Sequence, residues 1–197
     1  QSTYWGRRGI HYHQFLKAGE NTLNLKLARE LLLLIKKHDR YSRIMWLEHL
    51  VAYMTDPDSH NDTYIEEYLR HFFTQYGQGT DLMSCGRKDE NHIGGLCLML
   101  PLLMVFGRDR DLALKTALKH LALTHGGPQM HSGGHLIGEI VLDVLNGQPL
   151  LQSIADRFLD EENRKGGDER QPFESLFDFP DDVVVGRYFS SACYMAH

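Results

Sequence analysis

The longest apolar run of the chain is residues 93–106, IGGLCLMLPLLMVF. Two glycines and a proline interrupt it, and it falls short of the roughly 20 residues that a membrane-spanning helix needs. Its central part, Leu96–Val105, is apolar on every side, which is typical of a helix buried inside a globular domain. We therefore expect this helix to lie at the centre of the core, with most of four side chains nearly inaccessible to solvent: Leu98, Leu102, Met104 and Val105.

Apolar side chains recur at helical spacing on both sides of this run. Further helices are expected to begin after Thr22 or Asn24, after Ser42, after Asp62 or Thr63 and after Asp109 or Asp111, and to cover residues 133–146 and 150–159. The sequence shows neither a convincing strand pattern nor a long repeat. It predicts one all-α domain over residues 1–197, built from roughly six to eight packed helices.

Charge and cysteine usage exclude several classes of protein. Lys and Arg number 21 against 26 Asp and Glu, so the net charge is −5, which is unfavourable for binding nucleic acid. The three cysteines, Cys85, Cys97 and Cys193, are an odd number without CxxC spacing, which is typical of reduced thiols. We expect a cytoplasmic protein that interacts with neither nucleic acid nor a membrane.

Two glycine-containing segments are candidate binding elements, and each has two interpretations. Gly94-Gly95 precedes the apolar helix, so it provides either free amides for an anion or the space for a buried helix to begin. His125 precedes Gly126-Gly127 at the expected end of a helix. Its imidazole either interacts with the helix dipole as a cation or points into a cleft beside accessible backbone.

The sequence offers little for a metal. His131 and His135 are four residues apart, a spacing found in metal sites, but the Glu of the zinc-protease motif and a suitably spaced third ligand are missing. We expect this pair to hold no metal. The carboxylates are scattered and do not form the dense Asp/Thr cluster that a dinuclear Mg²⁺ site requires.

Several short motifs, taken in order, resemble one family. They are Gly19-Glu20-Asn21-Thr22-Leu23, Asn91-His92-Ile93-Gly94-Gly95-Leu96 leading to Leu100-Pro101-Leu102, Leu123-Thr124-His125, Leu145-Asn146-Gly147 and Gly186-Arg187-Tyr188. The chain thereby resembles the ADP-ribosylglycohydrolase superfamily over most of residues 9–197. It is most similar to the J-type branch, which holds the J-type crystallins and a related selenoprotein.

The resemblance implies an orthogonally packed all-α bundle. In active members, two Mg²⁺ ions sit in a cleft with ADP-ribose across them, and water attacks the anomeric carbon of the ribose. Their metal ligands come from a Thr-Asp-Asp cluster and a later Asp/Thr cluster, which would precede Gln1 and follow His197. The resemblance therefore implies that this chain is the central part of the domain, truncated at both ends, with the Mg²⁺ ligands outside it.

The resemblance implies that this chain contains one wall of the family's ligand site. Gly94 matches the glycine of the Asn-Gly-x-x-Met-Arg segment, and Thr124 and His125 match a Thr-His pair facing the ligand phosphates or ribose. The ligand-binding residues implied are Asn91, Gly94, Gly95 and His125. The family's Asn, Met and Arg are replaced by Ile93, Cys97 and Leu98, which removes two polar groups, each worth roughly 1–3 kcal/mol when buried and paired.

These observations lead to three hypotheses about function. The first is an ADP-ribosylglycohydrolase-like protein whose longer parent hydrolyses ADP-ribosyl linkages with Mg²⁺, this chain being inactive alone. Its expected ligand is ADP-ribose or a similar nucleotide, and no catalytic residue is assigned. The second is a non-catalytic structural protein, crystallin-like or filament-associated, with protein partners. The third is a binding module that holds a nucleotide-like ligand.

Overall fold

The computed structural model describes residues 13–164, with side chains as far as residue 159. Within that part the chain is all-α, as predicted, and its only strand-like feature is an isolated bridge between Arg87 and His125. The α-helices are α1 (Leu23–His38), α2 (Arg43–Thr55), α3 (Glu67–Gly77), α4 (Leu100–Phe106), α5 (Arg110–Leu121), α6 (Pro128–Leu145) and α7 (Leu150–Arg164). Two 3₁₀ helices, η1 (Leu82–Ser84) and η2 (Ile93–Leu98), lie between α3 and α4. Cys193 and the motif Gly186-Arg187-Tyr188 fall outside the described residues.

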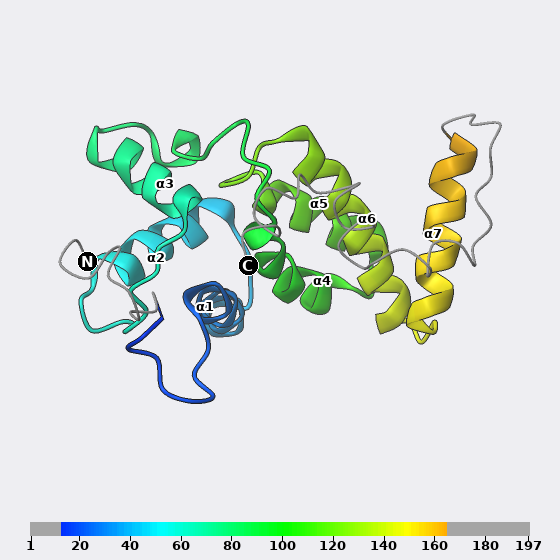
Figure 1. The fold of residues 1–197 in the computed structure, drawn as a ribbon, viewed down its shortest axis with the longest axis horizontal. Helices are drawn as coiled ribbons and strands as arrows, with labels where there is room; N and C mark the ends of the chain where they lie inside the picture. The colour runs from blue at the N-terminus through cyan, green and yellow to red at the C-terminus, as the bar shows by residue number, and fades with distance from the viewer. Residues whose placement is uncertain (1–12, 165–197) are drawn as a thin grey trace.

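The helices are spread along the length of the molecule (Figure 1). α2 and α3 lie at one end, α1 is seen along its axis near the middle, and α7 lies at the other end. α1 packs against η2 and α4, α5 packs against both α4 and α6, and α7 packs against α6. No helix of the described residues is both long and apolar enough to cross a bilayer.

The core draws on large side chains from several helices, because each helix presents an apolar stripe to its neighbours. Trp46 of α2, together with Tyr68 and Phe72 of α3, is among the largest fully buried side chains. Leucines of α1, α2 and α4 complete this region: Leu27, Leu31, Leu47, Leu50, Leu102 and Leu103.

The expected central helix is only partly as predicted. The stretch divides at Met99 into η2 and the seven-residue α4, which has a proline in its first turn. Leu98 and Leu102 are buried, but Met104 is 62% and Val105 41% exposed. The expectation for these two was wrong because α4 packs against its neighbours through one face only. At 100° per residue, Met104 lies about 160° from the buried Leu102, whereas Val105 lies only about 60° from it and is exposed in the last turn of this short helix.

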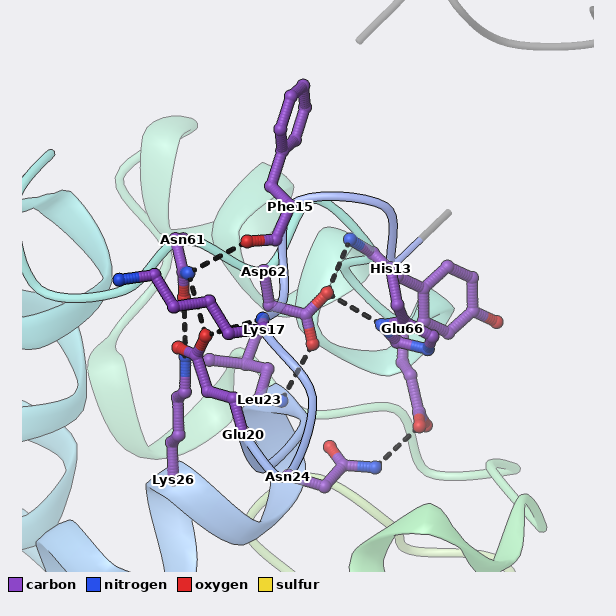
Figure 2. Close-up of polar contacts among 11 residues, drawn as sticks. His13, Phe15, Lys17, Glu20, Leu23, Asn24, Lys26, Asn61, Asp62 and Glu66 are labelled. Atoms are coloured by element: carbon purple, nitrogen blue, oxygen red, sulfur yellow. Dashed lines mark hydrogen bonds and ion pairs between the residues drawn. The ribbon is translucent and has the colours of Figure 1, made fainter. Parts of the chain in front are cut away.

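Helix starts are predicted correctly where the N-cap residue directly precedes its helix in the sequence. Thr22, Ser42 and Asp109 are the N-caps of α1, α2 and α5. α3 begins after Glu66 rather than after Asp62 or Thr63. The Asp62 carboxylate accepts instead from the amides of Leu23 (2.8 Å) and Tyr64 (3.1 Å), so it caps α1 across 39 positions of sequence (Figure 2).

The two last helices are longer than expected. α6 begins at Pro128 instead of residue 133, because proline is well suited to the first turn of a helix. α7 extends to Arg164, beyond the expected end at residue 159.

Candidate functional site

Gly95 and His125 are in direct contact, although about 30 positions separate them in the sequence. A Cβ atom on residue 95 would lie 2.5 Å from His125 Nδ1 and 2.6 Å from its Cε1. A backbone bond supports this approach, because the amide of Gly126 donates to the carbonyl of Arg87 at 2.8 Å. The structure thus brings together the two segments that the sequence pairs, while their binding of a ligand stays a prediction.

Gly94 lies against a carboxylate that the sequence analysis did not identify. A Cβ on residue 94 would lie 2.3 Å from Glu66 Oε2 and 2.9 Å from His92 Nδ1. Glu66 and His92 are themselves close, with 3.1 Å between Oε2 and Nδ1. The only sequence signal for Glu66 was its position just before an amphipathic helix, which resembles that of many surface residues.

The protonation state of His92 decides which partner its Nδ1 atom has. In the neutral ring Nδ1 accepts from the amide of Gly94 at 3.1 Å, and Glu66 Oε2 is then buried without a hydrogen-bond donor. In the protonated ring Nδ1–H donates to Glu66 instead. This hydrogen bond raises the pKa of His92 above its ordinary value, against an opposing effect of burial.

A chain of hydrogen bonds connects Glu66 to α1 and α3. The Asn24 amide group donates to Glu66 Oε1, and the Tyr68 hydroxyl donates to Asn24 Oδ1 at 2.9 Å. Figure 2 shows Asn24 at the start of α1 directed toward the Glu66 carboxylate. The Tyr68 ring then packs on His125, with 4.4 Å between ring centroids. We call Asn24, Glu66, Tyr68, His92 and His125 the polar wall.

His125 is a neutral, buried ring. Its side chain belongs to a residue only 2% exposed, and burial lowers its pKa to about 3, with the nearby His92 as a smaller cause. Nδ1 lies 2.8 Å from Thr124 Oγ1, whereas Nε2 is buried without a hydrogen-bond partner. The interpretation of His125 as a helix-dipole cation is therefore wrong, because the ring carries no charge at neutral pH.

Asn91 caps the first turn of α6, a role that the sequence did not indicate. Its Oδ1 accepts from the amide of Met130 at 3.3 Å, which satisfies a free amide in the first turn of α6. A Cβ on Gly127 would lie 2.1 Å from the same oxygen. Asn91 thus holds the start of α6 close to the segment that leads into Gly94-Gly95.

The two residues before Met99, Cys97 and Leu98, carry groups of low reactivity. Leu98 is 3% exposed and lies in the core. The Cys97 thiol donates to the Gly94 carbonyl at 3.0 Å, and burial raises its pKa to about 11. The thiolate form needed for nucleophilic attack is therefore scarce at neutral pH.

The polar wall does not fit Mg²⁺. This ion requires near-octahedral oxygen coordination, but Glu66 is the only carboxylate of the wall and one of its oxygens is bonded to Asn24. Across the described residues no group of three His, Cys, Asp or Glu side chains is placed to hold a metal. His131 and His135 are exposed on α6 and form no part of the wall.

Comparisons of the chain with protein-family models, with curated proteins and with solved structures found no match.

Proposed function

We propose that this chain is the helical body of an ADP-ribosylglycohydrolase-like protein and that it binds ADP-ribose or a similar nucleotide without hydrolysing it alone. The observation that carries the proposal is the contact of Gly94 with Glu66 and of Gly95 with His125. Glycines are required there because any side chain would displace the groups of the polar wall. The family resemblance pairs the same two segments as the wall of a ligand site.

The unpartnered atoms of the wall suit the hydroxyl groups of a sugar. His125 Nε2 is buried without a hydrogen-bond partner, and Glu66 Oε2 is in the same state whenever His92 Nδ1 carries no proton. A buried polar atom without a partner costs roughly 1–3 kcal/mol, so a ligand that supplies partners recovers this energy. A ribose diol offers two adjacent hydroxyls that donate to a carboxylate and either donate to or accept from an imidazole.

The state of the nearby groups favours binding over catalysis. At neutral pH His125 lacks the extra proton that an imidazolium acid would donate, and the Cys97 thiol is not in the thiolate form that a nucleophile needs. Leu98 offers no polar contact to a phosphate, and the wall does not fit Mg²⁺. These features support a ligand wall that lacks hydrolytic machinery of its own.

A structural protein is the second candidate function, and one observation favours it. The hydrogen bonds from Tyr68 through Asn24 to Glu66 tie α3 to α1 inside the fold. Such a network also serves a protein that retains the fold without a ligand. Exposed leucines on α1 offer apolar contact to a protein partner: Leu25, Leu32 and Leu33.

Titration with ADP-ribose distinguishes the two candidates. The ligand-binding proposal predicts saturable one-to-one binding by calorimetry without Mg²⁺, weakened by Glu66→Gln, whereas Glu67→Gln is the matched control because Glu67 is exposed. The absence of binding would favour the structural protein. A second assay incubates the chain with an ADP-ribosylated peptide and Mg²⁺ and measures free ADP-ribose. Turnover that is lost in His125→Ala would overturn the proposed lack of hydrolysis.

A further inference from the structure

A second candidate site lies between α5 and α6, which run side by side in Figure 1. Two glycines of α6 allow this close packing: a Cβ on Gly134 would lie 2.8 Å from Leu121, and one on Gly138 would lie 2.6 Å from Leu114. A groove of about 440 Å³ follows the two helices beside this contact. Its size falls in the range of small-molecule sites.

The floor of the groove is apolar. Leu114 and Leu118 line it from successive turns of α5, and Ala122 lines it from the residue that follows the helix. Leu118 is half-buried and Ala122 exposed, so the floor is open to solvent along part of its length. An apolar group placed there would remove this surface from water, which is favourable in proportion to the area covered.

Basic side chains border the groove on both sides. Lys115 and Lys119 line it from α5, and His131 and His135 line it from α6. The members of each pair are four residues apart, so they lie on the same face of their helix. All four are exposed, and their side chains form no ion pair or hydrogen bond with another described residue. Two unneutralised lysines at one groove contrast with the net charge of −5 of the whole chain.

The charges also give the groove a direction. Gly134 contacts Leu118 and Gly138 contacts Leu114, so α5 and α6 run antiparallel. His131 therefore lies near the Ala122 end of the groove, beside Lys119. Asp111, the single acid of the lining, lies at the opposite end.

We propose that the α5–α6 groove binds an organic anion with an apolar body, such as an acyl or aryl carboxylate. Its apolar body lies on Leu114 and Leu118, and its anionic head lies at the end formed by Lys119 and His131, away from Asp111. Lys115 adds positive charge along the body. No residue of the polar wall lines this groove, so the inference stands independently of ADP-ribose binding.

Sodium decanoate is a suitable probe, with decyltrimethylammonium as the cation of the same chain length, both below their micelle concentrations. We expect one-to-one calorimetric binding of decanoate, which weakens as salt screens the charges. The double variant Lys115→Gln/Lys119→Gln is expected to weaken it by about tenfold, since two solvent-exposed charge contacts are lost. Lys36→Gln/Lys37→Gln, two exposed lysines of α1, is the matched control and should leave binding unchanged.

A variant that fills the groove tests the location separately from the charge. Ala122→Trp at the exposed Ala122 should abolish decanoate binding while the circular dichroism spectrum stays that of the parent. Equal affinity for decyltrimethylammonium would overturn the proposal. Decanoate binding that is unchanged in both Lys115→Gln/Lys119→Gln and Ala122→Trp would overturn it as well. Tighter binding of a glutamate-rich peptide than of decanoate would also overturn it and would assign the groove to an acidic protein partner.

Discussion

Replacing Gly95 by alanine tests the contact on which the polar wall depends. The new Cβ would lie 2.5, 2.6 and 2.8 Å from three ring atoms of His125. Carbon atoms in contact prefer about 3.5–4.0 Å, so the ring would have to withdraw by about 1 Å. It has little room, because His125 is 2% exposed and packs on Tyr68.

The cost of Gly95→Ala follows from these contacts. Overpacking in a filled interior costs roughly 1–3 kcal/mol, and loss of the hydrogen bond between Thr124 and His125 adds roughly 1 kcal/mol. We therefore expect Gly95→Ala to lower the free energy of unfolding by about 2–4 kcal/mol in urea titrations. Gly77→Ala is the control, since a Cβ there meets nothing within 4 Å.

A double-mutant cycle separates the contact from other effects of alanine. In a His125→Ala background the ring is gone, so Gly95→Ala should cost less than about 1 kcal/mol. A Gly95→Ala penalty no larger than that of Gly77→Ala would show that residue 95 does not press on the His125 ring. An unchanged penalty in the His125→Ala background would contradict this contact as well, because the cost would then arise elsewhere.

Three further predictions concern other buried groups. Asp143→Asn should destabilise the protein by roughly 1–3 kcal/mol in urea titrations, because Arg110 and Arg157 each lose a charged acceptor while keeping their ion pairs with Glu139. Burial lowers the pKa of His120 to about 3, so unfolding takes up a proton and stability falls as pH drops from about 6.5 toward 3. His120→Gln should reduce this slope by about 1.4 kcal/mol per pH unit in unfolding titrations between about pH 6 and 4.5. Cys97 should react with iodoacetamide at pH 8 far more slowly than a free cysteine, because burial raises its thiol pKa to about 11; a rate equal to that of free cysteine would contradict this.

Local signals predicted much of the helical fold. The caps at Thr22, Ser42 and Asp109 were read correctly because a cap and its helix are adjacent in sequence. Asp62 was misread because its carboxylate caps a helix far away in the sequence. The exposure of Met104 depended on how many neighbours surround α4, which apolar composition alone does not determine.

The candidate site was predicted in part. The pairing of Gly95 with His125 came from the order of family motifs, since spacing alone gave two interpretations for each segment. Glu66 was missed because its importance arises from a contact with Gly94 that only the folded chain creates. The neutral state of His125 likewise depends on burial by Tyr68 and its neighbours, which no sequence pattern near His125 indicates.

The most direct test of the proposed ligand wall is a nuclear magnetic resonance titration of the isotope-labelled chain with ADP-ribose. The account predicts saturable shifts in the amides of Gly94 and Gly95 and in the ring nitrogens of His125. The ring of His131, at the separate α5–α6 groove, should not respond. Saturating ADP-ribose that leaves Gly94, Gly95 and His125 unshifted would contradict the account.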